Sequence, residues 1–241
     1  MANSFFKFKQ FIVHQEHSAM KVTTDSCLFG AWVAYDLKKD SHSKKLLDIG
    51  AGTGLLSLMI AQQKKTLAID AIEIEKEATV EATENIKRSP WKENINVIHG
   101  DVRDYEVQHE YDVIVSNPPF YENELQSVDQ QKNTAHHSNN LTIDFLFRFI
   151  QSAIIKNGCF YILVPYKRIA EIEILLKQNE LCLTEKVLVR QSINHNYFRV
   201  FIKGMLGNVH NERVSELSIK DSDQRYTKEF IELLKEYYLY L

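Results

Sequence analysis

The sequence predicts an α/β protein with a mainly parallel, twisted sheet, helices on both of its faces and an antiparallel hairpin at one edge. Three observations predict this fold class. Short runs rich in Val, Ile and Leu alternate with helical spacings between residues 45 and 165, a pattern typical of parallel sheets covered by helices. One apolar run leads directly into a glycine-rich turn at residues 50–54. Two strand-like runs lie close together after residue 180.

The chain of 241 residues is long enough for one domain of this class. We expect an N-terminal cap segment at 1–44, a core at 45–205 and a tail at 206–241. Alternating apolar and polar residues over 5–22 favour a strand or hairpin. Thr24 or Asp25 would cap a helix that runs to about Tyr35, because their side-chain oxygens can accept backbone N–H groups.

The core is expected to alternate strands and helices. The predicted strands are 45–49, 67–73, 95–99, 111–116 and 159–164, and the predicted helices are 54–63, 76–88 and 142–157. Another helix should open at Pro165 and run to about Lys177. The runs 181–189 and 197–203 would form the edge hairpin. The tail reads as polar up to residue 225 and then as a helix over 226–240.

The composition favours an ordinary cytoplasmic protein. The net charge is 29 − 32 = −3, which argues against attraction of nucleic acid by the whole surface but leaves room for a local basic patch. Three cysteines without C-x-x-C spacing indicate reduced thiols rather than a disulfide or a zinc site. No apolar run is long enough to span a membrane, and the N-terminus does not have the form of a signal peptide.

The glycine turn predicts a cofactor site. Gly50, Gly52 and Gly54 follow Asp48 at alternate positions, where unusual backbone angles and close approach of a ligand both require glycine. Free N–H groups at the following helix start could hold a polar ligand. A nicotinamide fingerprint reads G-x-G-x-x-G, so the shorter spacing here disfavours a pyrophosphate without excluding it.

Two further carboxylates follow neighbouring strands. Glu73 ends the second core strand, 73 − 54 = 19 residues after the last glycine, where it could accept the hydroxyls of a ribose. Asp101 follows the third, where it could accept a hydrogen bond from an adenine amino group. With Asp48 they would line one crevice, and their negative charge suits a cationic cofactor such as S-adenosyl-L-methionine. The alternative is that each is an ordinary loop or cap residue.

A second motif, Asn117-Pro118-Pro119-Phe120, follows the fourth core strand. The prolines have no N–H donors, so the Pro118 carbonyl and the Asn117 carboxamide oxygen remain as acceptors. They could bind the two N–H groups of a planar amino group and stabilise the charge that develops on its nitrogen during methyl transfer. Phe120 would stack on the ring. The alternative is a rigid turn with a packed Phe.

The pair of motifs at 48–54 and 117–120 resembles the class I S-adenosylmethionine-dependent methyltransferases, with a Rossmann-like fold, that modify exocyclic or amide nitrogens. With the stretch 21–32 and the overall length, the chain resembles the bacterial tRNA1(Val) (adenine(37)-N6)-methyltransferases over about residues 5–205. The resemblance implies transfer of a methyl group from S-adenosyl-L-methionine to N6 of adenosine 37 in the anticodon loop of a valine tRNA. It implies a direct transfer that needs no metal. Separately, we expect a monomer.

The resemblance also implies roles for individual residues. The cofactor would be bound by Thr24 and Asp25 near its methionine end, by Asp48, Gly50 and Gly52 along the turn, by Glu73 at the ribose, by Asp101 at the adenine, and by Asn117. The target base and the catalytic step would involve Asn117, Pro118, Pro119 and Phe120, with Tyr121 beside the base.

Four other functions remain open at this point. An N5-glutamine methyltransferase acting on a protein such as a release factor uses a similar turn, but usually carries Tyr in place of Phe120 and a helical N-terminal domain. A DNA adenine methyltransferase would need a target-recognition domain that is not visible. The protein could also be a non-catalytic nucleotide- or RNA-binding protein, or an NAD-dependent oxidoreductase.

Two weaker features bear on RNA. Basic residues and aromatic residues interleave in the last third of the chain and could form a binding strip; they are Lys167, Arg168, Lys186, Arg190, Arg199 and Lys203, with Tyr166, Tyr197 and Phe198. In the loop 121–140, His136 or His137 could accept a proton, although a solvated loop is the more common explanation.

Overall fold

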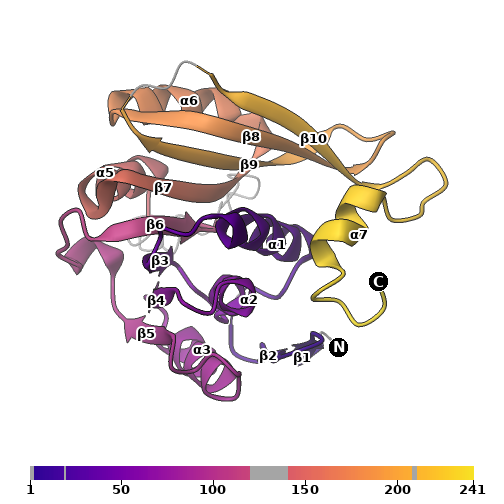
Figure 1. Cartoon of the computed structure of the whole chain (residues 1–241), viewed down its shortest axis with the longest axis horizontal. Helices are drawn as coiled ribbons and strands as arrows, with labels where there is room; N and C mark the ends of the chain where they lie inside the picture. Colours follow the sequence, from indigo (N-terminus) through magenta and orange to yellow (C-terminus); the bar gives the residue numbers. More distant parts are fainter. Residues whose placement is uncertain (1–2, 19, 120–140, 208–210) are drawn as a thin grey trace, which may run out of the picture.

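The computed structural model describes residues 3–18, 20–119, 141–207 and 211–241. These residues form an eight-stranded sheet and a separate two-stranded one (Figure 1). The large sheet has the spatial order β10 (Arg213–Lys220), β8 (Leu181–Ser192), β9 (Tyr197–Leu206), β7 (Ile154–Pro165), β6 (Tyr111–Ser116), β3 (Lys45–Ile49), β4 (Ala68–Glu73) and β5 (Ile95–His99). From β5 to β7 the strands are parallel, whereas β9 is antiparallel to both of its neighbours.

Helices cover both faces of this sheet, as predicted, and each face has its own apolar core. One core includes side chains of α1 (Thr24–Lys39), α2 (Leu55–Gln63), α3 (Lys76–Lys87) and α7 (Lys228–Leu234). The other includes side chains of α5 (Ile143–Ala153) and α6 (Ile169–Gln178). Two short 3-10 turns, η1 (Val102–Asp104) and η2 (Tyr166–Arg168), follow β5 and β7. Among the described residues, no helix is both long and apolar enough to cross a membrane.

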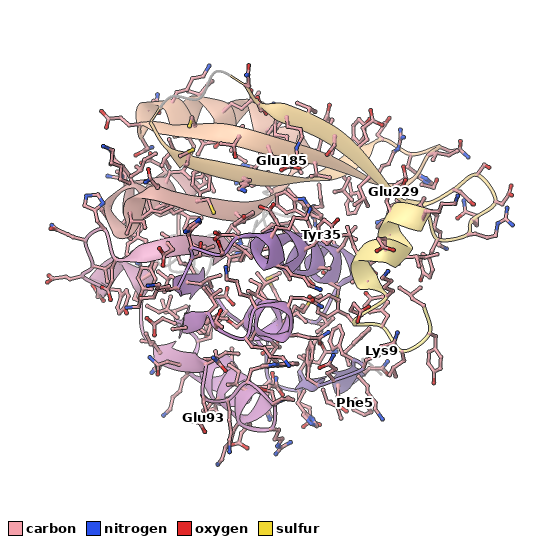
Figure 2. The ribbon with its side chains drawn as sticks, in the orientation of Figure 1. Phe5, Lys9, Tyr35, Glu93, Glu185 and Glu229 are labelled. Atoms are coloured by element: carbon pink, nitrogen blue, oxygen red, sulfur yellow. The ribbon has the colours of Figure 1, made fainter. Side chains whose placement is uncertain are left out.

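The N-terminal hairpin joins distant parts of the chain. Strands β1 (Phe5–Lys7) and β2 (Ile12–His14) pair in antiparallel fashion, which confirms the predicted hairpin. The Asn85 side chain of α3 bonds to the backbone of His14 and, at 3.0 Å, to the carbonyl of Thr53 in the glycine turn. The Lys9 N–H donates to the Tyr237 carbonyl at 2.8 Å, and Figure 2 shows Lys9 beside the C-terminal segment. The N-terminal hairpin is therefore bonded to the C-terminal segment and, through Asn85, to the glycine turn.

The structure corrects several element boundaries. Helix α5 ends at Ala153 rather than at residue 157, because the buried Ile154 already belongs to β7 and pairs with Tyr111 of β6. Thr23, not Thr24 or Asp25, caps α1: its side chain accepts the N–H of Ser26 in a capping box. The same helix runs past Tyr35 to Lys39.

The tail differs most from its prediction. The β8–β9 hairpin exists, but β10 pairs with β8 in parallel and takes the edge of the sheet. The sequence of β10 reads as polar because only Leu217 and Ile219 of its eight residues are buried. Helix α7 is shorter than the predicted 226–240 and begins after Thr227, whose side chain accepts the N–H of Phe230.

Candidate active site

The glycine turn between β3 and α2 has the backbone that its sequence predicts. Gly50, Gly52 and Gly54 have φ angles of 71°, 55° and 80°, in the left-handed region that glycine adopts without strain. A Cβ atom added to Gly50 or Gly52 would meet no atom within 4 Å. The space over this turn is therefore open, and a ligand can approach the main chain closely.

Asp48 lies beneath the turn and faces inward. Its side chain is fully buried, and the hydroxyl of Ser57 in α2 donates to Oδ2 at 2.7 Å. Within the described residues, Oδ1 has no hydrogen-bond partner. Burial raises the pKa of Asp48 to about 7, although the bond from Ser57 acts in the opposite direction. Ser57 was missed by the sequence reasoning; its signal is a lone polar side chain in the apolar run 55–61.

Glu73 lies at the end of β4, as predicted, and is bonded to the glycine turn. Its Oε2 accepts the N–H of Gly52 at 2.8 Å, and its Oε1 accepts the N–H of Glu75 at 2.9 Å. The N–H groups of Gly50 and Ala51 both donate to the carbonyl of Ile72. These three turn N–H groups are therefore bonded within the protein, whereas the N–H groups expected to hold a ligand are those at the start of α2, which begins at Leu55.

Asp101 follows β5, the neighbour of β4, and caps the turn η1. Arg103 donates to this carboxylate through its backbone N–H at 2.9 Å and through its guanidinium. The guanidinium holds the pKa of Asp101 below its ordinary value. The structure thus brings Asp101 to the same edge of the sheet as Glu73, but already in an ion pair.

The start of α1 is tied to the hairpin strand β9. Arg199 Nε donates to Asp25 Oδ2 at 2.8 Å across 199 − 25 = 174 positions, and the Asp25 side chain is only 15% exposed. Thr24 is exposed beside it. Sequence reasoning had no local signal for Arg199 as the partner of Asp25.

The Asn117-Pro118-Pro119 turn leaves β6 beside the glycine turn. Strands β3 and β6 are adjacent and parallel, with Ile49 opposite Ser116, and the Ser116 hydroxyl donates to the Ile49 carbonyl at 2.8 Å. Asn117 is half-buried, and within the described part of the chain its carboxamide makes no hydrogen bond. Phe120, Tyr121, His136 and His137 lie outside the described residues.

The expected basic strip is largely neutralised by its own ion pairs. Ion pairs between described residues are Arg168–Glu171 at 2.8 Å, Lys186–Glu173 at 2.5 Å, Arg190–Glu216 at 3.1 Å, Arg199–Asp25 at 2.8 Å and Lys203–Asp36 at 2.6 Å. Such pairing is consistent with the net charge of −3. Any affinity of this surface for RNA must therefore draw on more than surplus positive charge.

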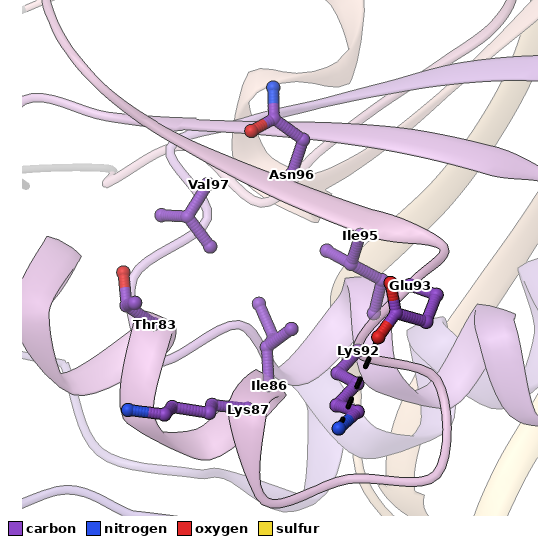
Figure 3. Close-up of a pocket in the computed structure, with 8 residues that line it drawn as sticks. All are labelled: Thr83, Ile86, Lys87, Lys92, Glu93, Ile95, Asn96 and Val97. Carbon is purple, nitrogen blue, oxygen red and sulfur yellow. Dashed lines mark ion pairs between the residues drawn. The ribbon is translucent and has the colours of Figure 1, made fainter.

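A separate pocket lies away from these residues, between α3 and β5 (Figure 3). Its volume is about 360 Å³ and its lining residues are Thr83, Ile86, Lys87, Lys92, Glu93, Ile95, Asn96 and Val97. It lies around the beginning of β5, whereas ligands of parallel sheets bind at the carboxyl ends of the strands. We therefore assign the candidate site to the carboxyl ends of the adjacent strands β3 and β6, where the glycine turn and the Asn-Pro-Pro turn begin. In the described residues, no group of three or more His, Cys, Asp or Glu side chains could hold a metal ion.

Comparison with solved structures supports the fold. A predicted O-methyltransferase from Agrobacterium tumefaciens superposes with a TM-score of 0.67 at 14% identity, covering 87% of this chain and 95% of that one. A putative RNA methyltransferase from Pyrococcus horikoshii gives 0.54 at 19% identity, with 78% and 83% covered. The class I methyltransferase fold predicted from the two motifs is confirmed.

Comparison of sequences identifies the family. The family model of the methyltransferase small domain matches residues 30–142. The tRNA1(Val) (adenine(37)-N6)-methyltransferase of Dyadobacter fermentans is 38% identical over 240 residues, covering 98% of each chain. The protein of the same name from Bacteroides thetaiotaomicron is 37% identical over 245 residues and covers 100% of both. The chain therefore belongs to the tRNA1(Val) (adenine(37)-N6)-methyltransferase family.

Proposed function

We propose that this protein methylates N6 of adenosine 37 in the anticodon loop of tRNA1(Val), with S-adenosyl-L-methionine as the methyl donor. The observation that carries the proposal is the placement of the Asn117-Pro118-Pro119 turn directly beside the glycine turn, on the adjacent parallel strands β6 and β3. An acceptor pair for an amino group and an open glycine turn thus follow neighbouring strand ends. The family relationship supports the same reaction.

The residues around the glycine turn fit this cofactor. Open space over Gly50 and Gly52 leaves room for a bulky ligand against the main chain. Among the described residues, Oδ1 of buried Asp48 has no hydrogen-bond donor, and a ligand or a water molecule would supply one. Each carboxylate oxygen of Glu73 accepts one backbone N–H group, and the remaining lone pairs can accept from ribose hydroxyls. We further propose that Asp101 accepts from the adenine and that Thr24 and Asp25 lie near the methionine end.

The cofactor supplies an electrophilic methyl group on a sulfonium. The protein has to orient a weakly nucleophilic amino group toward it, and Asn117 and Pro118 provide oxygen acceptors for its two N–H groups. These acceptors would stabilise positive charge on the nitrogen as the new bond forms. Holding both reactants in line supplies much of the rate enhancement. Pro119 would fix the turn, and Phe120 and Tyr121 would contact the base, as their places in the motif suggest.

The decisive experiment uses methyl-labelled S-adenosyl-L-methionine and unmodified bacterial tRNA, followed by digestion and identification of the labelled nucleoside. We expect N6-methyladenosine from tRNA1(Val). The Asn117→Ala variant should lose at least about 100-fold in turnover, the loss seen when one preorganised polar group is removed. Asn157→Ala, an exposed asparagine of β7, is the matched control and should retain full activity.

Other outcomes would replace the proposal. Label in a protein fraction alone would identify a glutamine methyltransferase. Binding of S-adenosylhomocysteine without any turnover would favour a non-catalytic role. Stabilisation by NAD rather than by S-adenosylhomocysteine would indicate an oxidoreductase.

We also propose that the protein acts as a monomer in the cytoplasm, where its tRNA substrate would be found. Light scattering coupled to size-exclusion chromatography would test the oligomeric state against the chain mass of 28.1 kDa. A mass of twice that value would contradict it.

A further inference from the structure

Two tyrosines lie at the strand ends on the side of the sheet where the Asn-Pro-Pro turn leaves β6. Strands β6 and β7 run parallel with Ser116 opposite Ile162, where β6 ends, and β7 continues to Pro165. Tyr166 follows Pro165 directly. Neighbouring strands are separated by about 4.8 Å. Tyr166 therefore follows the strand next to β6, the strand from which the turn proposed to bind the target base departs.

The second tyrosine comes from the adjacent antiparallel strand. Pro165 pairs with Arg199 of β9, which places the beginning of β9 beside the end of β7. The rings of Tyr166 and Tyr197 lie with centroids 5.3 Å apart and an interplanar angle of 49°. Tyr166 remains 38% exposed. The pair thus presents aromatic surface to solvent instead of burying it in the core.

Arg190 of β8 contacts Tyr197, the second tyrosine of the pair. Its guanidinium lies over the Tyr197 ring, 5.4 Å from the centroid. The guanidinium is itself held by Glu216 at 3.1 Å and by the Ser218 hydroxyl at 2.8 Å, both on the edge strand β10. Strands β7, β8, β9 and β10 lie side by side in the upper part of Figure 1. Tyr197 is therefore contacted by a side chain of β8 that is itself held by two side chains of β10.

The electrostatics of this surface favour stacking over charge attraction. Arg190 and Arg199 are both paired with carboxylates. Aromatic rings bind single-stranded nucleic acid by stacking on the faces of its bases, with or without surplus charge. An anticodon loop offers such unpaired bases beside the target adenosine.

We propose that Tyr166 and Tyr197 form a stacking platform for a nucleotide that flanks the target adenosine. The inference rests on the proposed function, since it takes the occupant of the adjacent site to be an RNA base. The platform positions RNA and takes no part in the transfer of the methyl group.

The test measures KM for tRNA and for S-adenosyl-L-methionine, together with binding of a short RNA hairpin that carries the anticodon loop. In Tyr166→Ala and Tyr197→Ala, KM for tRNA and Kd for the hairpin should rise about 10-fold, the loss expected for one base–aromatic stack. KM for the cofactor and kcat should stay within about twofold. Tyr166→Phe should restore the wild-type value, because it keeps the ring.

Tyr35→Ala provides the matched control. Tyr35 is also an exposed tyrosine, at 48%, but it lies on α1, ten residues after Asp25. This variant should bind the hairpin as the wild type does. Thermal unfolding of every variant would show whether the sheet edge remains folded.

The results separate the two proposals. If the wild type methylates tRNA and the alanine variants keep the wild-type KM for tRNA, only the platform is wrong. If KM for tRNA and for the cofactor rise together with a lower Tm, the pair is merely structural. If the wild type binds the hairpin through these tyrosines but yields no N6-methyladenosine, the platform stands and the proposed reaction falls. If it labels only protein and does not bind the hairpin, both fall.

Discussion

Glu73 accepts the backbone N–H of Gly52 at 2.8 Å, which joins the end of β4 to the glycine turn that follows β3. The other carboxylate oxygen accepts the N–H of Glu75 at 2.9 Å. Glu73 is only 7% exposed, and hydrogen bonds to an ionised acceptor are stronger than those between neutral groups. One side chain therefore fixes the glycine turn, and in the proposed function the same carboxylate would also accept from a ribose.

Replacing this carboxylate should affect the turn and the cofactor together. In Glu73→Gln an NH₂ group would face a backbone N–H, which leaves donors unpaired. We expect the free energy of unfolding to fall by about 1–3 kcal/mol and KM for S-adenosyl-L-methionine to rise by about 10-fold or more. Urea unfolding and initial rates measure the two effects. Glu77→Gln changes an exposed glutamate of α3 and should do neither; similar KM values for both variants would contradict the assignment.

Asp48 should make the stability of the cofactor-free protein depend on pH. Burial raises its pKa from 3.8 to about 7, so between about pH 4 and pH 7 the folded protein binds a proton that the unfolded chain has released. Stability must then decrease as the pH rises through this window. The measured quantity is the difference in the free energy of unfolding between the wild type and Asp48→Asn. This difference should fall by at most about 4 kcal/mol between about pH 4 and pH 7 and level off above pH 7.

Ser57→Ala provides the matched variant for that titration. The Ser57 hydroxyl donates to Asp48 and acts to lower its pKa. Its removal should extend the fall in stability to a higher pH. Urea unfolding at pH 5, 6, 7 and 8 tests both variants. If the difference in the free energy of unfolding between the wild type and Asp48→Asn does not vary with pH, Asp48 titrates near its ordinary pKa.

Local patterns were sufficient to predict most of the core. The strands at 45–49, 95–99 and 111–116 agree with the structure at both ends, because each is a short apolar run that stops at a glycine, a turn or a proline. The order of parallel strands then predicted that Glu73 and Asp101 meet at one edge. That placement needs only the topology and no detail of packing.

Contacts between distant segments could not be predicted. Asp25 pairs with Arg199 only because α1 packs against β9 in the folded protein, and no local sequence pattern encodes that pairing. The edge strand β10 was missed because an edge strand with one solvated face carries many charged residues. The inward orientation of Asp48 toward Ser57 likewise depends on how α2 packs against β3.

Gly204 is expected to be required for the close packing of three strands. A Cβ atom there would lie 2.2 Å from Phe160 Cζ of β7 and 2.5 Å from the Cys182 carbonyl oxygen of β8. Because one obstacle is backbone and the other is a fully buried ring, neither can move aside cheaply. We expect Gly204→Ala to lower the free energy of unfolding by about 3 kcal/mol or more, as measured by urea unfolding.

Gly100→Ala is the matched control for this substitution. Its Cβ would meet only Ile72 Cδ1, at 4.0 Å, so its effect should remain within about 1 kcal/mol. If both alanine variants unfolded at the same urea concentration, tight packing at Gly204 would be disproved.

Two adjacent threonines at the start of α1 should behave differently. Thr23 accepts the N–H of Ser26 at 3.4 Å, and the Ser26 hydroxyl accepts the N–H of Thr23 at 3.1 Å, so that Thr23 satisfies an N–H group of the first turn. Thr24 is exposed one residue later. Thr23→Ala should lower the free energy of unfolding by about 1 kcal/mol, whereas Thr24→Ala should change it by less than about 0.5 kcal/mol. Urea unfolding without cofactor measures both, and the reverse order of effects would return the cap to Thr24.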